Sequence, residues 1–414
     1  MTNHLQNKFL SILTLLLLAG NSMSGQDENT EAVRISIHGY VKADYITDSR
    51  QTISAREGHI FLFPQATVYD ADGKDINASP NFNILAVQSR LSVKFSGPDF
   101  FSMKAAGMIE GDFLGQSNAD INGLRLRHAF LTLSSEKIEI LMGQTWHPMV
   151  ILSCYPKVYS LNTGAPFHPA SRNPQLRIST KGDLKLIASF VSQRDFTSQG
   201  PQGTSSTYLR NAFLPNLNLQ TQFTSGKITT GAALDYKILK PRLSIFDTKT
   251  DATVQGLSGL VFFKYKVADF EIRTEAVYGN NLPDHLMLGG YAETMYDATT
   301  KDIEYLPFSV ISAWIDISDN FKQGEWGLFG GFSDNLGLKV PLANDYYTLG
   351  GNIDYIWRIA PRIAYVSGKI KIGLELETTA AAYGVLNIGD KEVNSTGVNP
   401  VFNARALLFG MYSF

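Results

Sequence analysis

Residues 33–45 read VRISIHGYVKADY, and this stretch decides the fold class. Every second residue from Val33 to Tyr45 is apolar or small, and the residues between them are largely polar. Adjacent side chains point to opposite faces only in a β-strand. The stretch therefore predicts a strand with one apolar face and one polar face.

The same period of two recurs along the chain. Further alternating runs span residues 85–95, 103–113, 270–278 and 370–376. A soluble β-sandwich alternates in the same way, with its polar face outward. Three features favour a barrel in lipid instead: runs of ten residues or more, alternation up to the last residue, and only 18% charged residues. Soluble domains carry roughly 25% charged residues. We therefore predict an all-β protein, a single transmembrane antiparallel β-barrel.

The number of connections between the alternating runs predicts the number of strands. Short turn signals occur at residues 97–99, 135–136, 182–183, 225–226, 268–269, 318–324 and 367–368. Longer irregular stretches lie near 47–83, 114–122, 146–173, 195–215, 240–255, 280–304, 334–348 and 384–400. Seven turns and eight loops predict sixteen strands, with short periplasmic turns and long extracellular loops. This count places 286–296 inside the sixth loop, and Pro361 is expected to mark a bulge because proline cannot donate to the ladder.

Charge and cysteine content exclude several classes of protein. The chain has 36 basic and 38 acidic residues, so a strongly basic nucleic-acid binder is excluded. Cys154 is the only cysteine, which excludes internal disulfides and a lipid-modified N-terminal cysteine. We interpret it as a passive small residue.

The N-terminus has the layout of a secretory signal peptide. Lys8 precedes an apolar core at 9–19, and small and polar residues follow it. An uncleaved anchor helix is the alternative, but the core is short for a membrane span. We predict a signal peptide at 1–25 and a barrel domain at 26–414.

The C-terminus is the most specific feature of the sequence. Phe414 is preceded at every second position by Tyr412, Gly410 and Leu408. This pattern resembles the final-strand signal of bacterial outer-membrane barrels. The last strand must close the barrel on the first, because lipid cannot solvate a free sheet edge.

Several strings in order along the chain resemble bacterial porins, and in particular the DcaP-like porin family. They are QSRL (88–91), IEGDF (109–113), RLRHAF (125–130), GQTW (143–146), NTGAPF (162–167), SRNPQ (171–175) and TTAAAYG (378–384). The likeness covers nearly the whole mature chain, from Gly39 to Phe414. It implies a homotrimeric Gram-negative porin that passes small hydrophilic solutes, including anionic, dicarboxylate-like ones. It also implies contacts with outer-membrane lipid, lipopolysaccharide and the barrel assembly machinery. Some family members carry an N-terminal coiled coil, for which residues 26–31 are too few.

Inward-facing charges are the candidate selectivity residues, because fixed charges in the wall set the preference of a pore. The positive candidates are Arg34, Lys42, Arg90, Lys94, Arg125, Arg127 and Arg177, and the negative ones are Glu110 and Asp112. The alternative is that these residues pair into salt bridges that brace the wall. Simple alternation places Leu131 and Leu133 on the same face as Arg125 and Arg127, so a bulge or a packed patch is expected there.

The segment from Trp146 to Asn173 resembles the loop that folds into a porin lumen. Its candidate constriction residues are Tyr155, Lys157, Tyr159, His168 and Arg172. They would either reach the constriction or pack the loop against the wall.

No catalytic constellation, cofactor motif or metal-ligand spacing is found in the sequence. A lipid enzyme would need a Ser/His pair on the lipid face, and His128 is the one weak lead. Two interpretations therefore remain. The first is a passive diffusion porin without enzymatic activity. The second is a closed barrel that acts as an adhesin, structural anchor or lipid enzyme.

Overall fold

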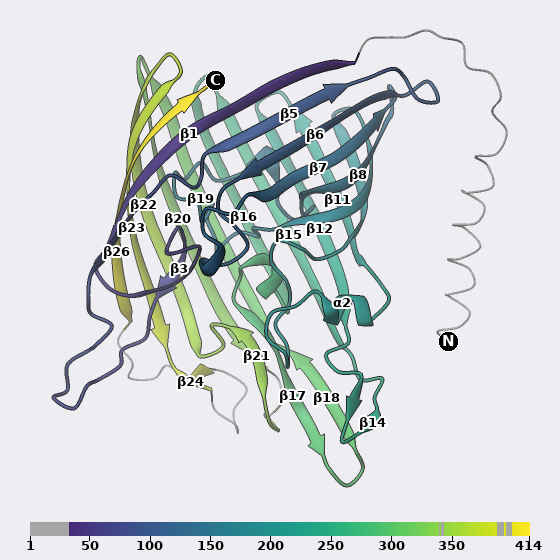
Figure 1. Cartoon of the computed structure of the whole chain (residues 1–414), viewed down its shortest axis with the longest axis vertical. Coiled ribbons are helices and arrows are strands. Elements are labelled where there is room, and N and C mark those ends of the chain that lie inside the picture. Colours follow the sequence, from purple (N-terminus) through teal and green to yellow (C-terminus); the bar gives the residue numbers. More distant parts are fainter. Residues whose placement is uncertain (1–32, 339, 341–342, 387–392, 395–399) are drawn as a thin grey trace. The chain divides into compact units, whose positions relative to one another are not determined.

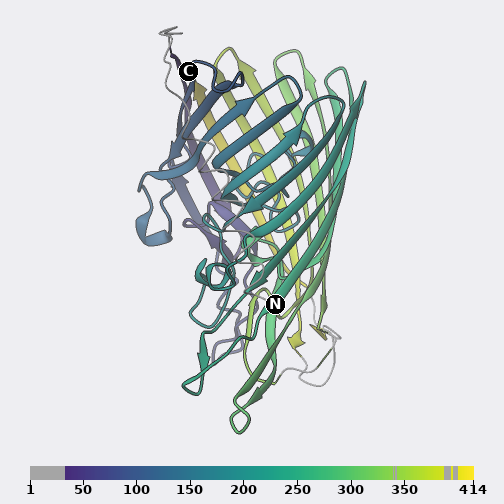
Figure 2. The same ribbon diagram turned by 90° about the vertical axis from the view of Figure 1, so that its right-hand side faces the viewer.

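Sixteen strands of the described chain form one closed antiparallel sheet, as predicted (Figures 1 and 2). The computed structural model describes residues 33–338, 340, 343–386, 393–394 and 400–414. The predicted signal peptide lies outside these residues. The wall strands are β1 (Arg34–Asp48), β4 (Asn81–Leu85) continued by β5 (Arg90–Ser96), β6 (Lys104–Asp112), β7 (Arg125–Ser134), β8 (Ile138–Trp146), β9 (Arg172–Thr180), β10 (Leu184–Val191), β11 (Asn216–Ser225), β12 (Ile228–Leu239), β15 (Val254–Val267), β16 (Phe270–Asn280), β19 (Ser309–Phe321), β20 (Gly324–Gly337), β22 (Ile353–Ser367), β23 (Ile370–Tyr383) and β26 (Val401–Ser413). Since β4 and β5 both pair with β1, they count as one interrupted strand.

The last strand closes the barrel on the first. β26 pairs with β1 from Tyr40 opposite Ser413 to Asp48 opposite Arg405. Phe414 N donates to Gly39 O at 3.0 Å, so the pairing extends to the last residue. The closing role predicted for the C-terminal strand is confirmed, and its alternation places Leu408 and Tyr412 on the outside.

Short turns join the strands at one end of the barrel and long loops at the other, also as predicted. The seven turns lie at 97–103, 135–137, 181–183, 226–227, 268–269, 322–323 and 368–369. The long loops that matter below are L1 (49–80), L3 (147–171), L4 (192–215) and L6 (281–308). We call the two ends of the barrel the turn end and the loop end.

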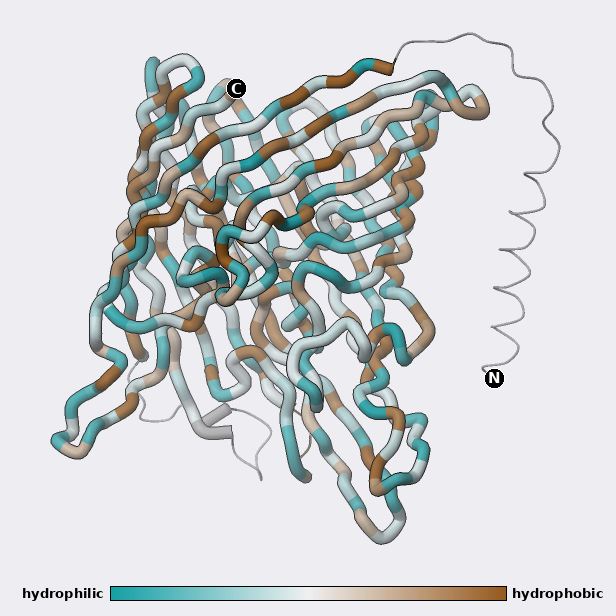
Figure 3. Tube along the Cα trace, in the orientation of Figure 1, coloured by the Kyte–Doolittle hydropathy of each residue, from teal (hydrophilic) through white to brown (hydrophobic). Residues whose placement is uncertain are grey.

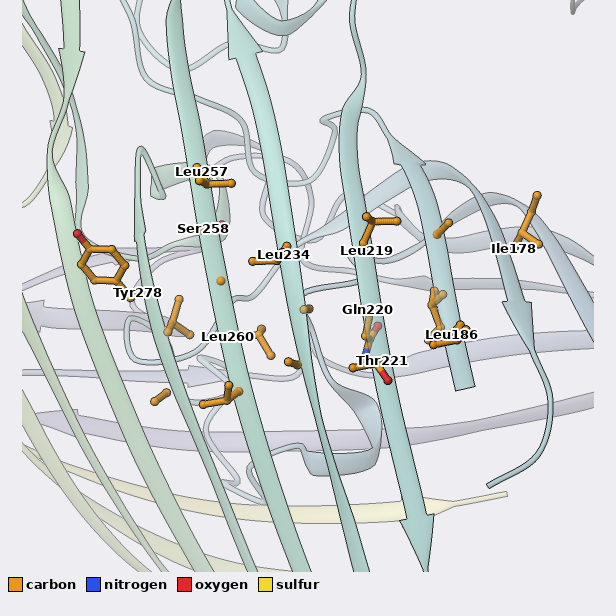
Figure 4. A pocket seen from close by; sticks show the side chains of 18 of the residues that line it. Ile178, Leu186, Leu219, Gln220, Thr221, Leu234, Leu257, Ser258, Leu260 and Tyr278 are labelled. Carbon is orange, nitrogen blue, oxygen red and sulfur yellow. The ribbon is translucent and has the colours of Figure 1, made fainter. Parts of the chain in front are cut away.

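Alternating hydropathy gives the wall two different faces (Figure 3). Leu219, Leu234, Leu257 and Tyr278 lie on four neighbouring strands and point outward, each more than half exposed (Figure 4). On β1, Lys42 and Asp44 point inward and are buried. An apolar exterior around a polar interior is the pattern of a barrel that faces lipid.

The loop end contains several short elements. In L1 and the loop after β6 these are β2 (Thr52–Ala55), β3 (Ile60–Pro64) and η1 (Asn118–Asp120); in L3 and L4 they are η2 (Leu152–Cys154) and α2 (Thr207–Asn211). The remaining ones are β13 (Ser244–Ile245), β14 (Thr248–Lys249), η3 (Pro283–His285), β17 (Gly289–Asp297), β18 (Asp302–Pro307), β21 (Tyr346–Leu349), β24 (Val385–Leu386) and β25 (Val393–Asn394). Among the residues described, no helix is long and apolar enough to cross a membrane.

Two local predictions need correction. Residues 286–296 do lie outside the wall, but they are not irregular: β17 pairs with β18 and β21 in a separate three-stranded sheet. Pro361 marks no bulge, because the register between β22 and β23 is the same at Ile359–Thr378 and at Arg362–Glu375. The ladder continues past the one missing N–H.

An apolar core fills part of the lumen. It joins residues of L1, L3 and L6 to inward side chains of the wall, and includes Phe63, Met149, Phe167, Met287, Trp314 and Phe329. Each of these side chains is at most 3% exposed. The interior of the barrel is therefore partly a packed core.

Candidate functional site

L3 runs through the lumen and is bound to the wall by carboxylates. Glu375 on β23 accepts the backbone N–H groups of Tyr159 at 2.7 Å and Ser160 at 3.0 Å. Glu377, two residues further along β23, accepts a hydrogen bond from Asn162 Nδ2 at 3.0 Å. Hydrogen bonds to charged acceptors are stronger than neutral ones, so these contacts fix the middle of L3 against β23.

A buried arginine joins L3 and L1 to the same side of the wall. Arg358 on β22 donates to Ala165 O at 2.9 Å and to Leu62 O at 2.8 Å. Its guanidinium also lies 4.8 Å from the ring centroid of Phe61. Arg358 and the two carboxylates thus hold both inserted loops against β22 and β23.

A cavity of about 540 Å³ remains between L3 and strands β5 to β8. Most of its wall residues are polar, charged or aromatic, with Met108 the apolar exception, and apolar residues of L1, L3 and L6 border its loop side. Residues lining it include Tyr40, Arg90, Glu110, Arg125, Arg127, His128, Trp146, Tyr155, Tyr159, Asn162 and Arg172. We call it the arginine cavity.

Two carboxylates of β6 bind the arginines of the neighbouring strands. Asp112 binds Arg125 in a bidentate pair, with Oδ1–Nε 3.0 Å and Oδ2–NH2 2.8 Å. Arg127 lies between the two carboxylates, with Nε 2.8 Å from Glu110 and NH1 3.1 Å from Asp112. Arg90 Nε is 3.5 Å from Glu110. All five groups therefore lie at one height in the barrel.

Register explains this shared height. Arg90 lies opposite Asp112, and Asp112 lies opposite Arg125. The expected bulge is confirmed: the pairing shifts beside Glu110, and Arg127 is the extra residue of β7. Because of that shift Arg125, Arg127 and His128 are all buried inside, and Leu131 points outward.

A second group closes the loop side of the arginine cavity. Arg172 NH2 lies 2.5 Å from Asp195 of L4, and Asp195 also binds Arg125 NH1 at 3.3 Å. The guanidinium of Arg172 stacks 4.5 Å from the ring centroid of Trp146. Tyr155 packs against the same indole with the ring centroids 5.9 Å apart.

The arginine cavity carries an excess of positive charge. Four arginines line it or face it, and they share three carboxylates: Glu110, Asp112 and Asp195. The side chain of Arg90 is 20% exposed, whereas those of Arg125 and Arg127 are 1% and 3% exposed. Arg90 is therefore the arginine of this group with the most direct access to a solute.

The structure divides the other candidate residues by position. Arg34 and Lys94 lie near the turn end, where they line a separate hollow. Lys42 binds Asp44 at 2.9 Å, and Arg177 donates to the Trp146 carbonyl at 2.8 Å. Neither of these two lines the arginine cavity.

The L3 candidates divide in the same way. Tyr155, Tyr159 and Arg172 line the arginine cavity. His168 is fully buried and its Nδ1 lies 3.0 Å from Glu275, so it braces the loop. Lys157 is half exposed in the lumen and lies 3.3 Å from Glu271.

Sequence reasoning missed several lining residues. Tyr40 and Trp146 belong to quoted strings or strands, and their inward positions follow from the alternation on β1 and β8. Asp195 and Phe196 lie in L4, where no periodicity indicates direction. His59, which binds Asp44 at 2.9 Å, also went unnoticed because L1 was expected outside the lumen.

The hypothesis that His128 belongs to a catalytic Ser/His pair on the lipid face is wrong. His128 is 5% exposed and points inward, with its Nδ1 3.0 Å from Thr145 Oγ1. Cys154 is buried in L3, and burial raises the pKa of its thiol to about 12. A thiol held protonated in this way is a poor nucleophile.

Comparisons with known proteins agree with the barrel. No protein-family model and no curated protein matches the sequence. Among solved structures, the outer-membrane channel DcaP of Acinetobacter baumannii matches with a TM-score of 0.66 and 18% identity, over 95% of this chain and 100% of that one. An anion-selective porin from Comamonas acidovorans matches with a TM-score of 0.55 and 10% identity, over 92% of this chain and 100% of that one. The outer-membrane protein OmpT of Vibrio cholerae matches with a TM-score of 0.54 and 12% identity, over 95% of this chain and 100% of that one. The resemblance to DcaP-like porins is thus confirmed at the level of the fold: this chain forms a closed sixteen-stranded barrel that matches porin-like outer-membrane barrels.

Proposed function

We propose that the protein is an outer-membrane channel of a Gram-negative bacterium through which small hydrophilic anions diffuse passively. The observation that carries this proposal is the arginine cavity, in which four guanidinium groups share three carboxylates beside an inserted loop. Fixed positive charge in a narrow lumen favours anions, and the surrounding low dielectric strengthens its field. The permeating class is small carboxylates, including dicarboxylates.

The position of L3 supports a route on one side of the lumen. Glu375, Glu377 and Arg358 hold the inserted loops against β22 and β23. A solute that crosses the barrel would pass between L3 and strands β5 to β8, where Arg90 and Arg172 face the free space. Aromatic rings of Tyr40 and Trp146 border the same route and limit its width.

Export and assembly follow from the same proposal. Residues 1–25 would be removed as a signal peptide, and residues 26–414 would form the mature barrel. The turns would face the periplasm and the long loops the outside, as in other barrels of this kind. The mature chain would assemble as a homotrimer in lipid and lipopolysaccharide after insertion by the barrel assembly machinery. No enzymatic activity is proposed.

One observation favours a second candidate function. L1, L3 and L6 build an apolar core inside the lumen, including Phe63, Phe167 and Met287. A barrel closed by this core would act as an adhesin or structural anchor and would not conduct.

Planar-bilayer recording of the purified protein separates the two functions. A channel gives discrete conductance steps, and a KCl gradient gives a reversal potential on the anion side. A closed barrel that is folded and heat-modifiable gives no steps. Steps with cation preference would retain the channel and reject the anion assignment.

A further inference from the structure

Three metal-ligating side chains from distant parts of the sequence meet inside the barrel. His147 begins L3, Asp235 lies on β12, and His285 ends η3 in L6. They are 1%, 3% and 0% exposed, and one potential ligand atom from each lies within 4.8 Å of the others. His147 Nε2 is 3.6 Å from Asp235 Oδ1, and the two imidazole ring centroids are 4.6 Å apart.

One ring nitrogen of each histidine in this group has no hydrogen-bond partner among the described residues. Nε2 of His147 and Nε2 of His285 are buried and have no hydrogen-bond partner in the described part of the chain. Buried polar atoms of native proteins nearly always have a partner, and exceptions commonly mark a bound ion or water. Two such imidazoles beside one buried carboxylate indicate a ligand of positive charge.

Neighbouring side chains orient two of the three groups. Ser171 Oγ lies 3.4 Å from His285 Nδ1, so a proton on Nδ1 leaves the Nε2 lone pair free. Asn218 Nδ2 donates to Asp235 Oδ1 at 3.2 Å. Hydrogen bonds of this kind, outside the ligands themselves, are usual at protein metal sites.

Metal binding at His147 would break one existing hydrogen bond. The Met149 amide donates to its Nδ1 at 3.2 Å. A metal on Nε2 would place the imidazole proton on Nδ1, so this contact would have to open.

Within the described part of the chain, Asp235 forms no ion pair with a lysine or arginine. Lys237 is the adjacent cation, but it forms its ion pair with Asp284. Arg177 acts on His147, and its guanidinium is bound to Gln175 and to the Trp146 carbonyl. A buried carboxylate that faces two neutral imidazoles is costly unless a cation joins it.

We propose that His147, Asp235 and His285 form a binding site for a divalent transition metal of the zinc class. Imidazole nitrogen with one carboxylate suits zinc, whereas calcium and magnesium take oxygen ligands. At Zn–N distances of about 2.0–2.1 Å, tetrahedral ligand atoms lie about 3.3 Å apart, close to the 3.6 Å between His147 and Asp235. Water completes the fourth position.

Such a site would act as a clamp. It joins the first residue of L3 to L6 and to the wall at β12, on the side of the lumen opposite the carboxylate anchors of Glu375 and Glu377. No sequence pattern indicates this site, because the three positions are 88 and 50 residues apart and follow no ligand spacing. The site does not depend on the proposed channel function, since it could exist in an open or a closed barrel.

The test uses the full mature chain without a histidine tag, folded in detergent and stripped with EDTA. Zinc content is measured by mass spectrometry after reconstitution, and cobalt(II) is titrated as a coloured probe. We expect one metal per chain and a higher melting temperature with zinc. H285Q and D235N should each weaken binding by more than about tenfold, since even outer-shell changes cost 10–100-fold.

The matched control is H59Q, which removes a buried histidine that also contacts an aspartate, Asp44, at 2.9 Å. It should bind zinc as the wild type does. Wild-type protein that stays metal-free, or H285Q and D235N that bind as tightly as wild type, would overturn the site. If the variants do not fold, X-ray absorption of the zinc-loaded wild type decides: two imidazole ligands support the site, and fewer than two reject it.

Discussion

The ring of Phe414 lies directly against the backbone of Gly39. A Cβ atom at position 39 would sit 2.6 Å from Phe414 Cζ and 2.4 Å from Arg90 O, both shorter than real Cβ contacts. Phe414 N also donates to Gly39 O. The closing residue of the barrel thus fits over a glycine of the first strand, and closure depends on both.

We expect G39V to impair barrel closure. The added atoms overlap the backbone of β5 and the Phe414 ring, and overpacking of this kind costs about 1–3 kcal/mol or more. The fraction of heat-modifiable barrel on an unboiled gel measures the effect. G410A is the matched control on the closing strand, because nothing lies within 4 Å of a Cβ at that position. Equal barrel fractions in the two variants would contradict this role of Gly39.

The barrel could be predicted from the sequence because its signal is local. Alternation at 33–45 depends only on the pleat of one strand, and it predicted the inward positions of Lys42 and Asp44. Turns and loops alternate in length, which gave the count of sixteen. The insertion of L1 was missed, although the apolar run at Ile60–Phe63 is unusual for a solvent-exposed loop.

The arginine cavity could be predicted only in part, because only its strand residues follow a local sequence period. Arg90, Arg127 and Glu110 follow from strand alternation, so their meeting was expected. Asp195 reaches Arg172 through the path of L4, which no sequence period describes. The pairing of these arginines with Glu110 and Asp112 is the alternative that the sequence left open, salt bridges that brace the wall.

E375A should loosen L3. It removes the acceptor of two backbone hydrogen bonds and leaves the amides of Tyr159 and Ser160 buried without a partner, at a cost of about 3 kcal/mol or more. We expect a lower melting temperature and noisier open-channel current. E375Q should recover part of the effect, because its amide oxygen still accepts.

The control for the anchor is E304A, which removes an exposed carboxylate from β18. It should leave both the melting temperature and the current noise as in wild type. If E375A matches E304A in both measurements, Glu375 does not hold the loop.

Anion preference should depend on pH through Lys157. Burial, assisted by the nearby Arg273, lowers the pKa of Lys157 to about 8 from an ordinary 10.5. The side chain is charged below this value and neutral above it, so anion preference should fall as the pH rises from 7 to 9. The pKa of Lys157 is lower in the folded state than the ordinary 10.5 of the unfolded chain. Between these two values the unfolded state binds more protons, so the contribution of Lys157 to stability becomes more favourable as the pH rises above about 8.

Reversal potentials measured across this pH range test the assignment. K157Q should show a weak pH dependence, and K249Q, in an exposed hairpin of the loop after β12, should retain the wild-type profile. A wild-type profile in K157Q would assign the titration to another group.

We expect R90Q to change ion selectivity and R127Q to impair barrel assembly. Arg90 is partly exposed in the arginine cavity and holds Glu110 at 3.5 Å, so R90Q should assemble normally and shift the reversal potential toward cations. A unit charge 4 Å from an ion is worth about 1 kcal/mol even in bulk water, which is about fivefold for an anion, about fivefold in the opposite sense for a cation, and so about 30-fold in their permeability ratio. The shift should be largest at low salt, because the screening length grows from about 10 Å at 0.1 M to about 30 Å at 0.01 M. Arg127 is buried between Glu110 and Asp112, so R127Q leaves both carboxylates short of a partner and should reduce the amount of assembled barrel. Bilayer recordings at both salt concentrations, together with barrel yield on gels, separate the two effects. If R90Q keeps the wild-type ion preference at 0.01 M salt, the positive charge that selects anions lies instead at Arg172, beside Trp146 and L3.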